Sequence, residues 1–157
     1  MQHLMLSINK SLQIKLKRLV TFLNQVHKEF EDVAEEIDNN NLKTALQALA
    51  VESCQYASEI NNELMHFHIS LQADYTDQAW KEIEKSITDD ERSLTEGGEI
   101  AAICKNCESR FNKLYEEALA EFIPDKNLQD MITYQLYATR LAFKKIMLLN
   151  KLRFNHY

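Results

Sequence analysis

Apolar residues recur at steps of three and four from Leu12 to Phe67, which is the spacing of one face of an α-helix. The first stripe comprises Leu12, Leu16, Leu19, Leu23, Val26, Phe30, Val33 and Ile37. The second comprises Leu42, Leu46, Leu49, Ser53, Tyr56, Ile60, Leu64 and Phe67. The polar run Asp38-Asn39-Asn40-Asn41 separates them, and short polar side chains favour turns and helix N-caps. We therefore predict a helical hairpin with two arms of about 40 Å, the second reaching about His68.

Two further stripes occupy the second half of the chain. One comprises Ile100, Cys104, Cys107, Phe111, Leu114 and Ala118, and it predicts a helix from about Glu99 to Phe122. The other comprises Leu128, Ile132, Gln135, Thr139, Ala142, Ile146 and Leu149, and it predicts a helix that ends near Arg153. Pro124 suits the first turn of this last helix, where the N–H that proline lacks would have no partner.

The segment between the two halves has its own pattern. Trp80, Ile83 and Ile87 share one side of a short helix that we predict from about Thr76 to Ile87. The polar stretch from Thr88 to Gly98 ends on two adjacent glycines, which predicts a loop.

Helix breakers are rare, with two glycines and one proline in 157 residues. Apolar residues make up 45 % of the composition, as in a globular protein, and the length suits one domain. We predict an all-α, up-down-up-down four-helix bundle with a short extra helix between its second and third long helices. Residues 1–157 would form this single domain.

Positive charge is concentrated near the two chain ends, although the net charge is −6. Residues 10–28 carry five basic and no acidic side chains, and residues 140–153 do the same. In an up-down-up-down bundle these segments share one end, so we predict a basic end. Our preferred interpretation covers it with an acidic flap, Asp74 to Glu91. The alternative is binding of an anionic polymer or lipid, but the negative overall charge and the lack of an Arg-rich signature predict no nucleic-acid partner.

The sequence predicts a cytoplasmic protein. The start of the chain, Met1 to Lys10, lacks a basic segment followed by an unbroken apolar one, so we expect no signal peptide. No apolar run approaches the roughly 20 residues of a membrane span. Three cysteines in a chain that is not small and loop-rich predict free thiols in a reducing compartment.

A four-helix bundle raises the question of a di-iron site, which takes a Glu from each of two helices and a Glu-x-x-His pair from each of the other two. Candidate carboxylates occur on three helices: Glu29 or Glu31, Glu52 and Glu108. The pair Glu63-x-x-His66 lies near a helix end, away from the level of Glu52. From Ile132 to Asn155 the last helix has no Asp, Glu or His. We predict no cofactor and no metal site, with Glu31, Glu52 and Glu108 as the remaining candidates.

Other polar residues on the stripes are interpreted as parts of the core or its rim. Gln135 is predicted to be a core amide that bonds to a neighbour such as Glu52 or Glu108. The pair Cys104-x-x-Cys107 lacks the four ligands of structural zinc and does not follow a strand, so it predicts two small core thiols. His27 and Glu31, one turn apart, are predicted to form a half-buried or surface pair. The tyrosines are assigned to core and rim packing: Tyr56, Tyr115, Tyr134 and Tyr137.

No catalytic motif emerges from the sequence. A phosphate-binding loop would need more than two glycines, and no Gly-x-Ser-x-Gly motif occurs. We therefore predict that the protein is not an enzyme.

Several pieces of the chain resemble a known bacterial family. They are Leu42-Lys43, Trp80, Cys107-Glu108 followed by Tyr115-x-x-Ala118-Leu119, and Pro124. Over about Lys17 to Leu152 the chain resembles a ferritin-like family that is defined only as a domain of unknown function. The resemblance implies a ferritin-like four-helix bundle and no known reaction. Some ferritin-like relatives bind two metals, but the ligands missing from the last helix mean that this activity is not carried over, and Glu52 and Glu108 would be its remnants.

Three functions follow from these observations. The first is a non-enzymatic bundle that associates with itself or with another protein, since apolar residues remain outside the stripes: Ile14, Phe22, Trp80, Met147 and Phe154. The second is a degenerate or single-metal site built from Glu29 or Glu31, Glu52 and Glu108, with His27 as a further ligand. The third is binding of an anionic polymer or lipid by the predicted basic end.

Overall fold

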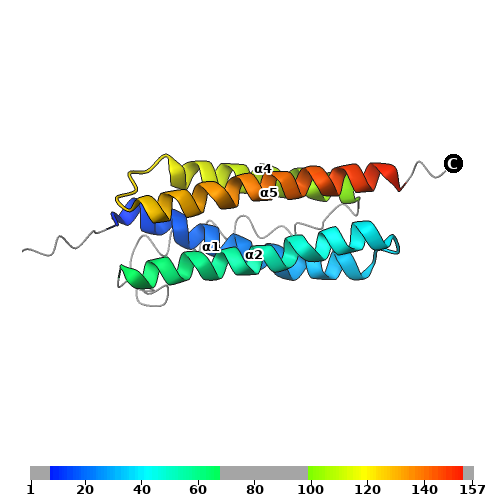
Figure 1. The fold of residues 1–157 in the computed structure, drawn as a ribbon, viewed down its shortest axis with the longest axis horizontal. Helices are drawn as coiled ribbons and strands as arrows, with labels where there is room; N and C mark the ends of the chain where they lie inside the picture. The colour runs from blue at the N-terminus through cyan, green and yellow to red at the C-terminus, as the bar shows by residue number, and fades with distance from the viewer. Residues whose placement is uncertain (1–7, 68–98, 154–157) are drawn as a thin grey trace, which may run out of the picture.

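The computed structural model describes residues 8–67 and 99–153, which form four α-helices packed as a bundle (Figure 1). The helices are α1 (Lys10–Glu35), α2 (Asn40–His66), α4 (Ile100–Leu119) and α5 (Lys126–Leu152). None of these four has both the length and the hydropathy that crossing a membrane requires. The predicted short helix from Thr76 to Ile87 and the predicted loop that follows it lie outside the described residues.

Asparagine side chains determine where the first two helices begin. The Oδ1 atom of Asn9 accepts a hydrogen bond from the backbone N–H of Leu12 at 2.8 Å, and Asn39 does the same for Leu42 at 3.0 Å. These oxygens satisfy N–H groups that have no partner within the first turn of a helix. Asn39 belongs to the polar run that the sequence places between the first two helices, so that prediction is confirmed.

The start of α5 differs from the prediction that placed Pro124 in its first turn. Asp125 is the N-cap, with its Oδ1 atom accepting a hydrogen bond from the N–H of Asn127 at 3.1 Å. Pro124 precedes the cap and has no side-chain acceptor. The helix therefore begins two residues later, at Lys126, where the aspartate can satisfy a free N–H group.

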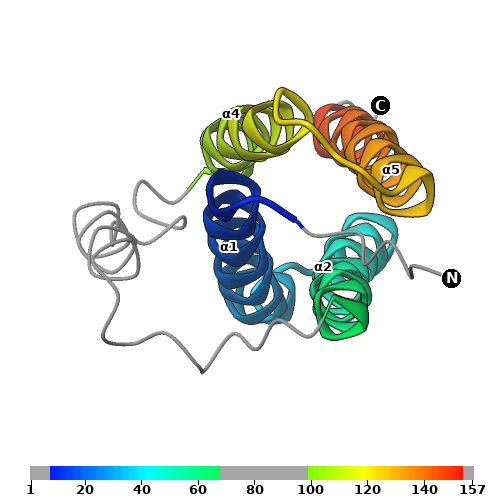
Figure 2. The same ribbon diagram turned by 90° about the vertical axis from the view of Figure 1, so that its left-hand side faces the viewer.

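Seen end-on, the helices stand at the corners of a square in the order α1, α2, α5, α4 (Figure 2). Figure 1 shows that α2 and α4 run in one direction, whereas α1 and α5 run in the other. Every neighbouring pair is therefore antiparallel, and the two diagonal pairs are parallel. The predicted up-down-up-down order is wrong, because the helices run up, down, down and up.

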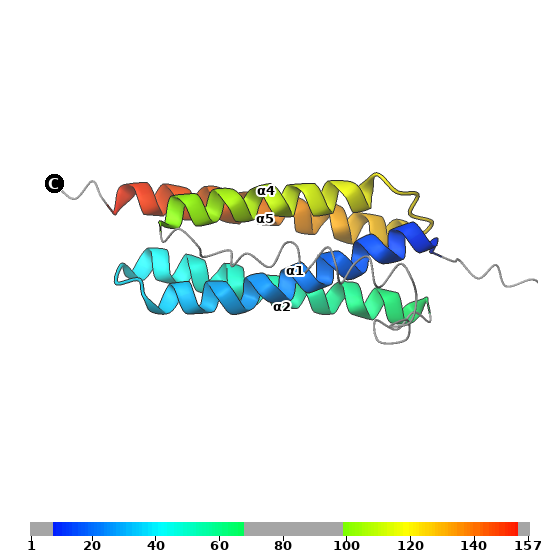
Figure 3. The ribbon, with the colours of Figure 1, turned by 180° about the vertical axis from the view of Figure 1, so that it is seen from behind.

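Contacts between α1 and α4 agree with these directions. The Ser11 hydroxyl donates to a Glu121 carboxylate oxygen at 2.6 Å, and Lys15 pairs with the same carboxylate. Arg18 lies 3.7 Å from Glu117, so the start of α1 is beside the end of α4 (Figure 3). The hydrogen bonds from Lys15 and Ser11 hold the pKa of Glu121 below its usual value.

The helix directions also correct the predicted basic end. The chain leaves α2 at one end of the bundle and enters α4 at the other, so the start of α1 and the end of α5 lie at opposite ends (Figure 1). The prediction placed the end of the second helix and the start of the third at the same end of the bundle, whereas α2 ends and α4 begins at opposite ends (Figure 1). Residues 10–28 and 140–153 therefore do not converge, so these two segments form no single basic end for an anionic polymer or lipid.

The predicted stripes form the core of the bundle. On α1 the residues from Leu12 to Val33 in the stripe are all buried, and on α2 those from Leu42 to Leu64 are too. Phe22, which the sequence analysis assigned to spare surface, has only 6 % of its surface exposed. It is buried because α1 packs against both α2 and α4, and two neighbours cover a wider arc than one stripe.

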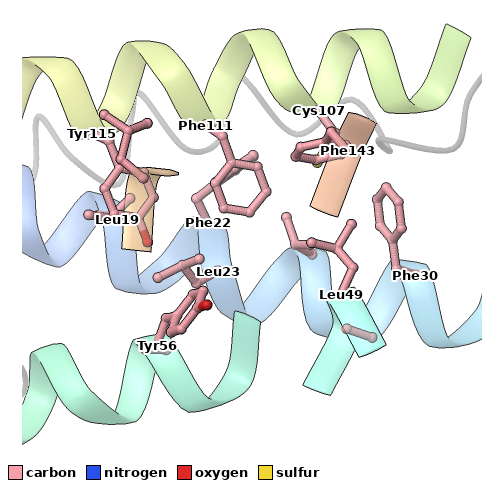
Figure 4. Packing of buried hydrophobic residues seen from close by; sticks show 14 of the residues in the cluster. Leu19, Phe22, Leu23, Phe30, Leu49, Tyr56, Cys107, Phe111, Tyr115 and Phe143 are labelled. Atoms are coloured by element: carbon pink, nitrogen blue, oxygen red, sulfur yellow. The ribbon is translucent and has the colours of Figure 1, made fainter. Parts of the chain in front are cut away.

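An aromatic cluster centred on Phe111 of α4 fills the space between α1, α4 and α5 (Figure 4). Its ring meets Phe22 of α1 edge-on, with centroids 5.0 Å apart, and Phe143 of α5 at 5.5 Å. It stacks on Tyr115, one turn further along α4, at 6.0 Å. Such pairs contribute about 0.5–1.5 kcal/mol each beyond the burial of their area.

We predict that Phe111→Ala lowers the free energy of unfolding by about 3–5 kcal/mol, because it leaves a cavity among three aromatic partners. Urea unfolding followed by circular dichroism would measure this loss. Phe122→Ala is the matched control, because Phe122 is 75 % exposed and its removal should change stability by less than about 0.5 kcal/mol. Equal effects of the two substitutions would contradict the placement of Phe111.

Candidate functional site

Glu31, the metal candidate on α1, pairs with a histidine of its own helix. Its Oε1 atom lies 3.8 Å from Nε2 of His27, and the other ring nitrogen, Nδ1, is 2.9 Å from the carbonyl oxygen of Ala50 on α2. Because a carbonyl oxygen only accepts, Nδ1 is the donor in this contact. The predicted half-buried or surface pair is confirmed, and His27 also ties α1 to α2.

Glu52 and Glu108 are half-buried and have different neighbours. Burial, followed by the charge of Glu52, raises the pKa of Tyr56 on α2 to about 12. Burial and then the charge of Glu108 raise the pKa of Cys104 on α4 to about 12. Each carboxylate thus acts on a residue of its own helix.

The structure does not bring the three candidate carboxylates together. Within residues 8–67 and 99–153, no three His, Cys, Asp or Glu side chains are grouped closely enough to hold a metal ion. The ligand set suggested for a degenerate site, with Glu29 or Glu31 beside Glu52 and Glu108, is therefore not assembled among these residues.

A polar cluster around Gln135 lies in the core between α2, α4 and α5. Gln135 is fully buried, and its Oε1 atom accepts a hydrogen bond from the Tyr115 hydroxyl at 2.9 Å. Its Nε2 atom donates to a Glu59 carboxylate oxygen at 3.0 Å and to the Tyr56 carbonyl oxygen at 3.4 Å. The prediction of a satisfied core amide is confirmed, but its carboxylate partner is Glu59 rather than Glu52 or Glu108.

Both phenols of this cluster are held in their protonated form. The pKa of Tyr115 lies well above its usual value because of burial, and then because of Tyr56 and Glu59. The Tyr115 hydroxyl can therefore act as the donor that Gln135 requires across the neutral range. The cluster is a chain of satisfied hydrogen bonds that ties α5 to both α2 and α4.

The two cysteines of α4 face the core, as predicted, and are fully or almost fully buried. Burial is the main cause that raises the pKa of Cys107 far above its usual value, and the neighbouring Cys104 raises it further. Since the thiolate is the reactive form, both side chains are poor nucleophiles at neutral pH. Cys54 on α2 is exposed.

The outer face of α5 carries a second apolar stripe. Six of the nine large apolar side chains that are exposed in the described part of the chain belong to this helix. We name five of them the outer stripe: Tyr134, Tyr137, Leu141, Leu148 and Leu152. At 3.6 residues per turn these positions lie opposite the buried face of α5, which includes Ile132, Gln135, Thr139 and Phe143.

The outer stripe was not predicted from the sequence. On this helix only Met147 was assigned to spare apolar surface, and Tyr134 and Tyr137 were assigned to core and rim packing, whereas both are well exposed. A usable signal was present, because Tyr134, Leu141 and Leu148 are seven residues apart and therefore share one side of a helix. The core stripe of the same helix is the stronger pattern and accounted for the amphipathic character of the helix, so no second stripe was predicted.

Arg140 borders the outer stripe on the side of α4. Its Nε atom donates to Oδ1 of Asn112 at 2.8 Å, and an NH2 group donates to Glu116 at 2.9 Å. The guanidinium also lies 5.6 Å from the centre of the Tyr137 ring. These contacts orient Tyr137 beside α4 and leave most of its surface exposed.

Comparisons with protein-family models, with curated proteins and with solved structures found no match for this chain. The resemblance to a ferritin-like family therefore stays a prediction.

The Tyr115–Gln135 hydrogen bond should appear as a coupling in a double-mutant cycle. Tyr115→Phe and Gln135→Leu should each lower the free energy of unfolding by about 1–3 kcal/mol, since each leaves a buried partner without its bond. The free energy of unfolding that the double variant loses should be smaller than the sum of the two single losses by at least about 1 kcal/mol. Tyr115→Phe combined with Val51→Ala, on the surface of α2, should be additive. Additive losses in the first pair would show that this bond contributes nothing.

Stability should fall in alkali because the native state holds protons that the unfolded chain releases. Unfolded thiols and phenols ionise near 9.0 and 10.0, whereas the pKa values of Cys104 and Tyr56 in the folded protein are about 12. The stabilising effect is complete below about pH 9 and is lost as the pH rises toward about 12. Urea midpoints measured between about pH 8 and 11 should therefore decrease, and less steeply in Tyr56→Phe. A constant or rising midpoint would contradict the burial of these groups.

Proposed function

We propose that this protein is a non-enzymatic helical bundle that acts by association, and that the outer stripe of α5 is its binding surface. The observation that carries the proposal is the exposure of Leu141, which is 66 % accessible on a helix whose opposite face is already fully packed. When a helix of a bundle is apolar on two opposite faces, its own fold buries only one of them, and the other is available to a partner.

The energetics of this stripe support a binding role. Burying a leucine side chain contributes about 1.5–3 kcal/mol, and the outer stripe contains three of them beside two tyrosines. Contiguous apolar surface of this kind is uncommon on monomers and marks contact sites. Tyrosines are also enriched at the centres of protein interfaces, where the ring is buried and the hydroxyl finds a partner.

The chemistry of the core supports a role without catalysis. The pKa values of the thiols at Cys104 and Cys107 keep them protonated at neutral pH. The hydrogen-bonding groups of Gln135 are engaged with Tyr115, Glu59 and the Tyr56 backbone. The three free cysteines favour a reducing compartment, and we propose the cytoplasm.

We also propose that the bundle is of the ferritin-like type. Ferritin-like bundles have one connection that crosses the length of the bundle. Here α2 ends and α4 begins at opposite ends of the bundle, as do the two helices that such a connection joins (Figure 1). The corrected helix order therefore supports the resemblance better than the predicted one did.

Site-specific photocrosslinking in the native host would test the association. A photoreactive residue at Leu141 or Leu148 should give a discrete, light-dependent adduct whose partner is identified by peptide mass spectrometry. The matched control position is Val51 on α2, which is 58 % exposed against 57 % for Leu148 but lies outside the outer stripe. If Leu141 and Leu148 yield no more adduct than Val51, the proposed role of α5 is wrong.

A further inference from the structure

The spacing of the outer stripe suits a second helix as its occupant. Tyr134, Leu141 and Leu148 are seven residues apart, and Tyr137 and Leu152 follow at the intermediate steps of three and four. This is the repeat with which two helices pack side chains into each other's gaps. The stripe runs over most of α5, which is about 40 Å long. A long, straight helix of the partner would match it.

Charges along the stripe indicate the direction of that helix. Leu141 lies midway between Asp130 and Leu152, eleven residues from each, and three of the four lysines of α5 lie on one side of this midpoint, at Lys144, Lys145 and Lys151. A parallel copy of α5 would place each lysine against its own counterpart. An antiparallel copy centred on Leu141 instead places Asp130 opposite Leu152 and next to Lys151. The helix is therefore complementary to itself in the antiparallel orientation.

The same antiparallel arrangement gives Lys145 suitable neighbours. Position 145 of one copy lies opposite Tyr137 of the other, so its ammonium can approach the face of that ring. Lys145 also follows Tyr134 by about three helical turns and is rotated slightly toward Gln135, which bonds to α2, so it lies at the edge of the outer stripe nearer α2. On that side the second copy offers Glu59, whose carboxylate is level with Gln135. In the parallel arrangement neither contact would form.

The available area is sufficient for a stable pair. A contact that covers the roughly 40 Å of α5 and half of each neighbouring helix is about 20 Å wide, since a helix with its side chains is about 10 Å across. This gives about 800 Å² per copy, the size of a standard interface. Two copies of the same patch related by a twofold axis bury it completely.

We propose that the occupant of the outer stripe is a second copy of this chain, docked with the two α5 helices antiparallel about a twofold axis at Leu141. The inference rests on the proposed function and names its partner. Because the axis passes through Leu141, one substitution at this position alters both halves of the contact.

Analytical ultracentrifugation of the purified chain tests the partner. The unaltered protein should be a dimer at micromolar concentration, and Leu141→Glu should raise the dissociation constant at least about 100-fold because it brings two carboxylates together on the axis. Val51→Glu, which introduces the same charge at a similarly exposed apolar position of α2, should leave the constant within about twofold. Circular dichroism should show equal helix content in all three proteins. A monomer at concentrations up to about 1 mM, or equal effects of both substitutions, would overturn the proposal.

Disulfide trapping tests the orientation independently of any loss of folding. In a Cys54→Ser background, Leu141→Cys should form a dimer on mild oxidation, since its Cα atom meets its own counterpart. Tyr134→Cys and Leu148→Cys should crosslink when mixed, and neither should do so alone. Dimers from Tyr134→Cys alone and from Leu148→Cys alone would indicate parallel helices and would refute the antiparallel arrangement.

The two proposals can fail separately. If the purified chain stays monomeric and Leu141→Cys forms no disulfide, the second copy is excluded as the partner. Photocrosslinking from Leu141 to a different identified protein would then still support association through α5. Loss of both signals would refute both proposals.

Discussion

The edge-to-face contact between Phe22 and Phe111 joins the two helical hairpins of this bundle along one seam. The hairpins are α1–α2 and α4–α5, and they meet again only where α2 packs against α5 among the described helices. The second seam is made by Gln135, which bonds to Glu59 and to the Tyr56 carbonyl. An aromatic contact is tolerant of sliding, whereas a buried amide with fixed partners is not. The aromatic seam thus buries two large rings, and the polar seam fixes the register of α5 on α2.

Periodicity alone predicted the helices and most of the core, because the stripes depend on steps of three and four within each helix. It did not predict the helix directions. A stripe is equally apolar read from either end, and residues 68–98 are long enough to return along the bundle or to turn at its end. The prediction of a basic end was wrong for the same reason. The partner of Gln135 was missed because Glu52 and Glu59 lie seven residues apart in one row of α2, and only the register between helices selects between them.

Position on a helix also explains the residues that sequence analysis assigned to the wrong surface. Phe22 was expected outside because it lies beside the first stripe, yet α1 has two neighbours and buries a wider arc. Tyr134 and Tyr137 were assigned to core and rim packing, yet both lie on the exposed face of α5. In a square bundle each helix has about half of its circumference covered. The covered half can be located only when the neighbours are known, which a single sequence does not specify.

The polar seam also shapes the surface that we propose for binding. Gln135 and Tyr134 are adjacent in the chain and about 100° apart around α5, with Gln135 buried and Tyr134 exposed, so a bond that fixes the rotation of one fixes the other. The same bond also places the Glu59 carboxylate of α2 beside α5 at the level of Gln135. A purely apolar seam would bury as much area at a lower desolvation cost, but it would allow α5 to rotate and slide. The buried amide therefore gives the outer face of α5 a defined orientation, which a specific contact requires.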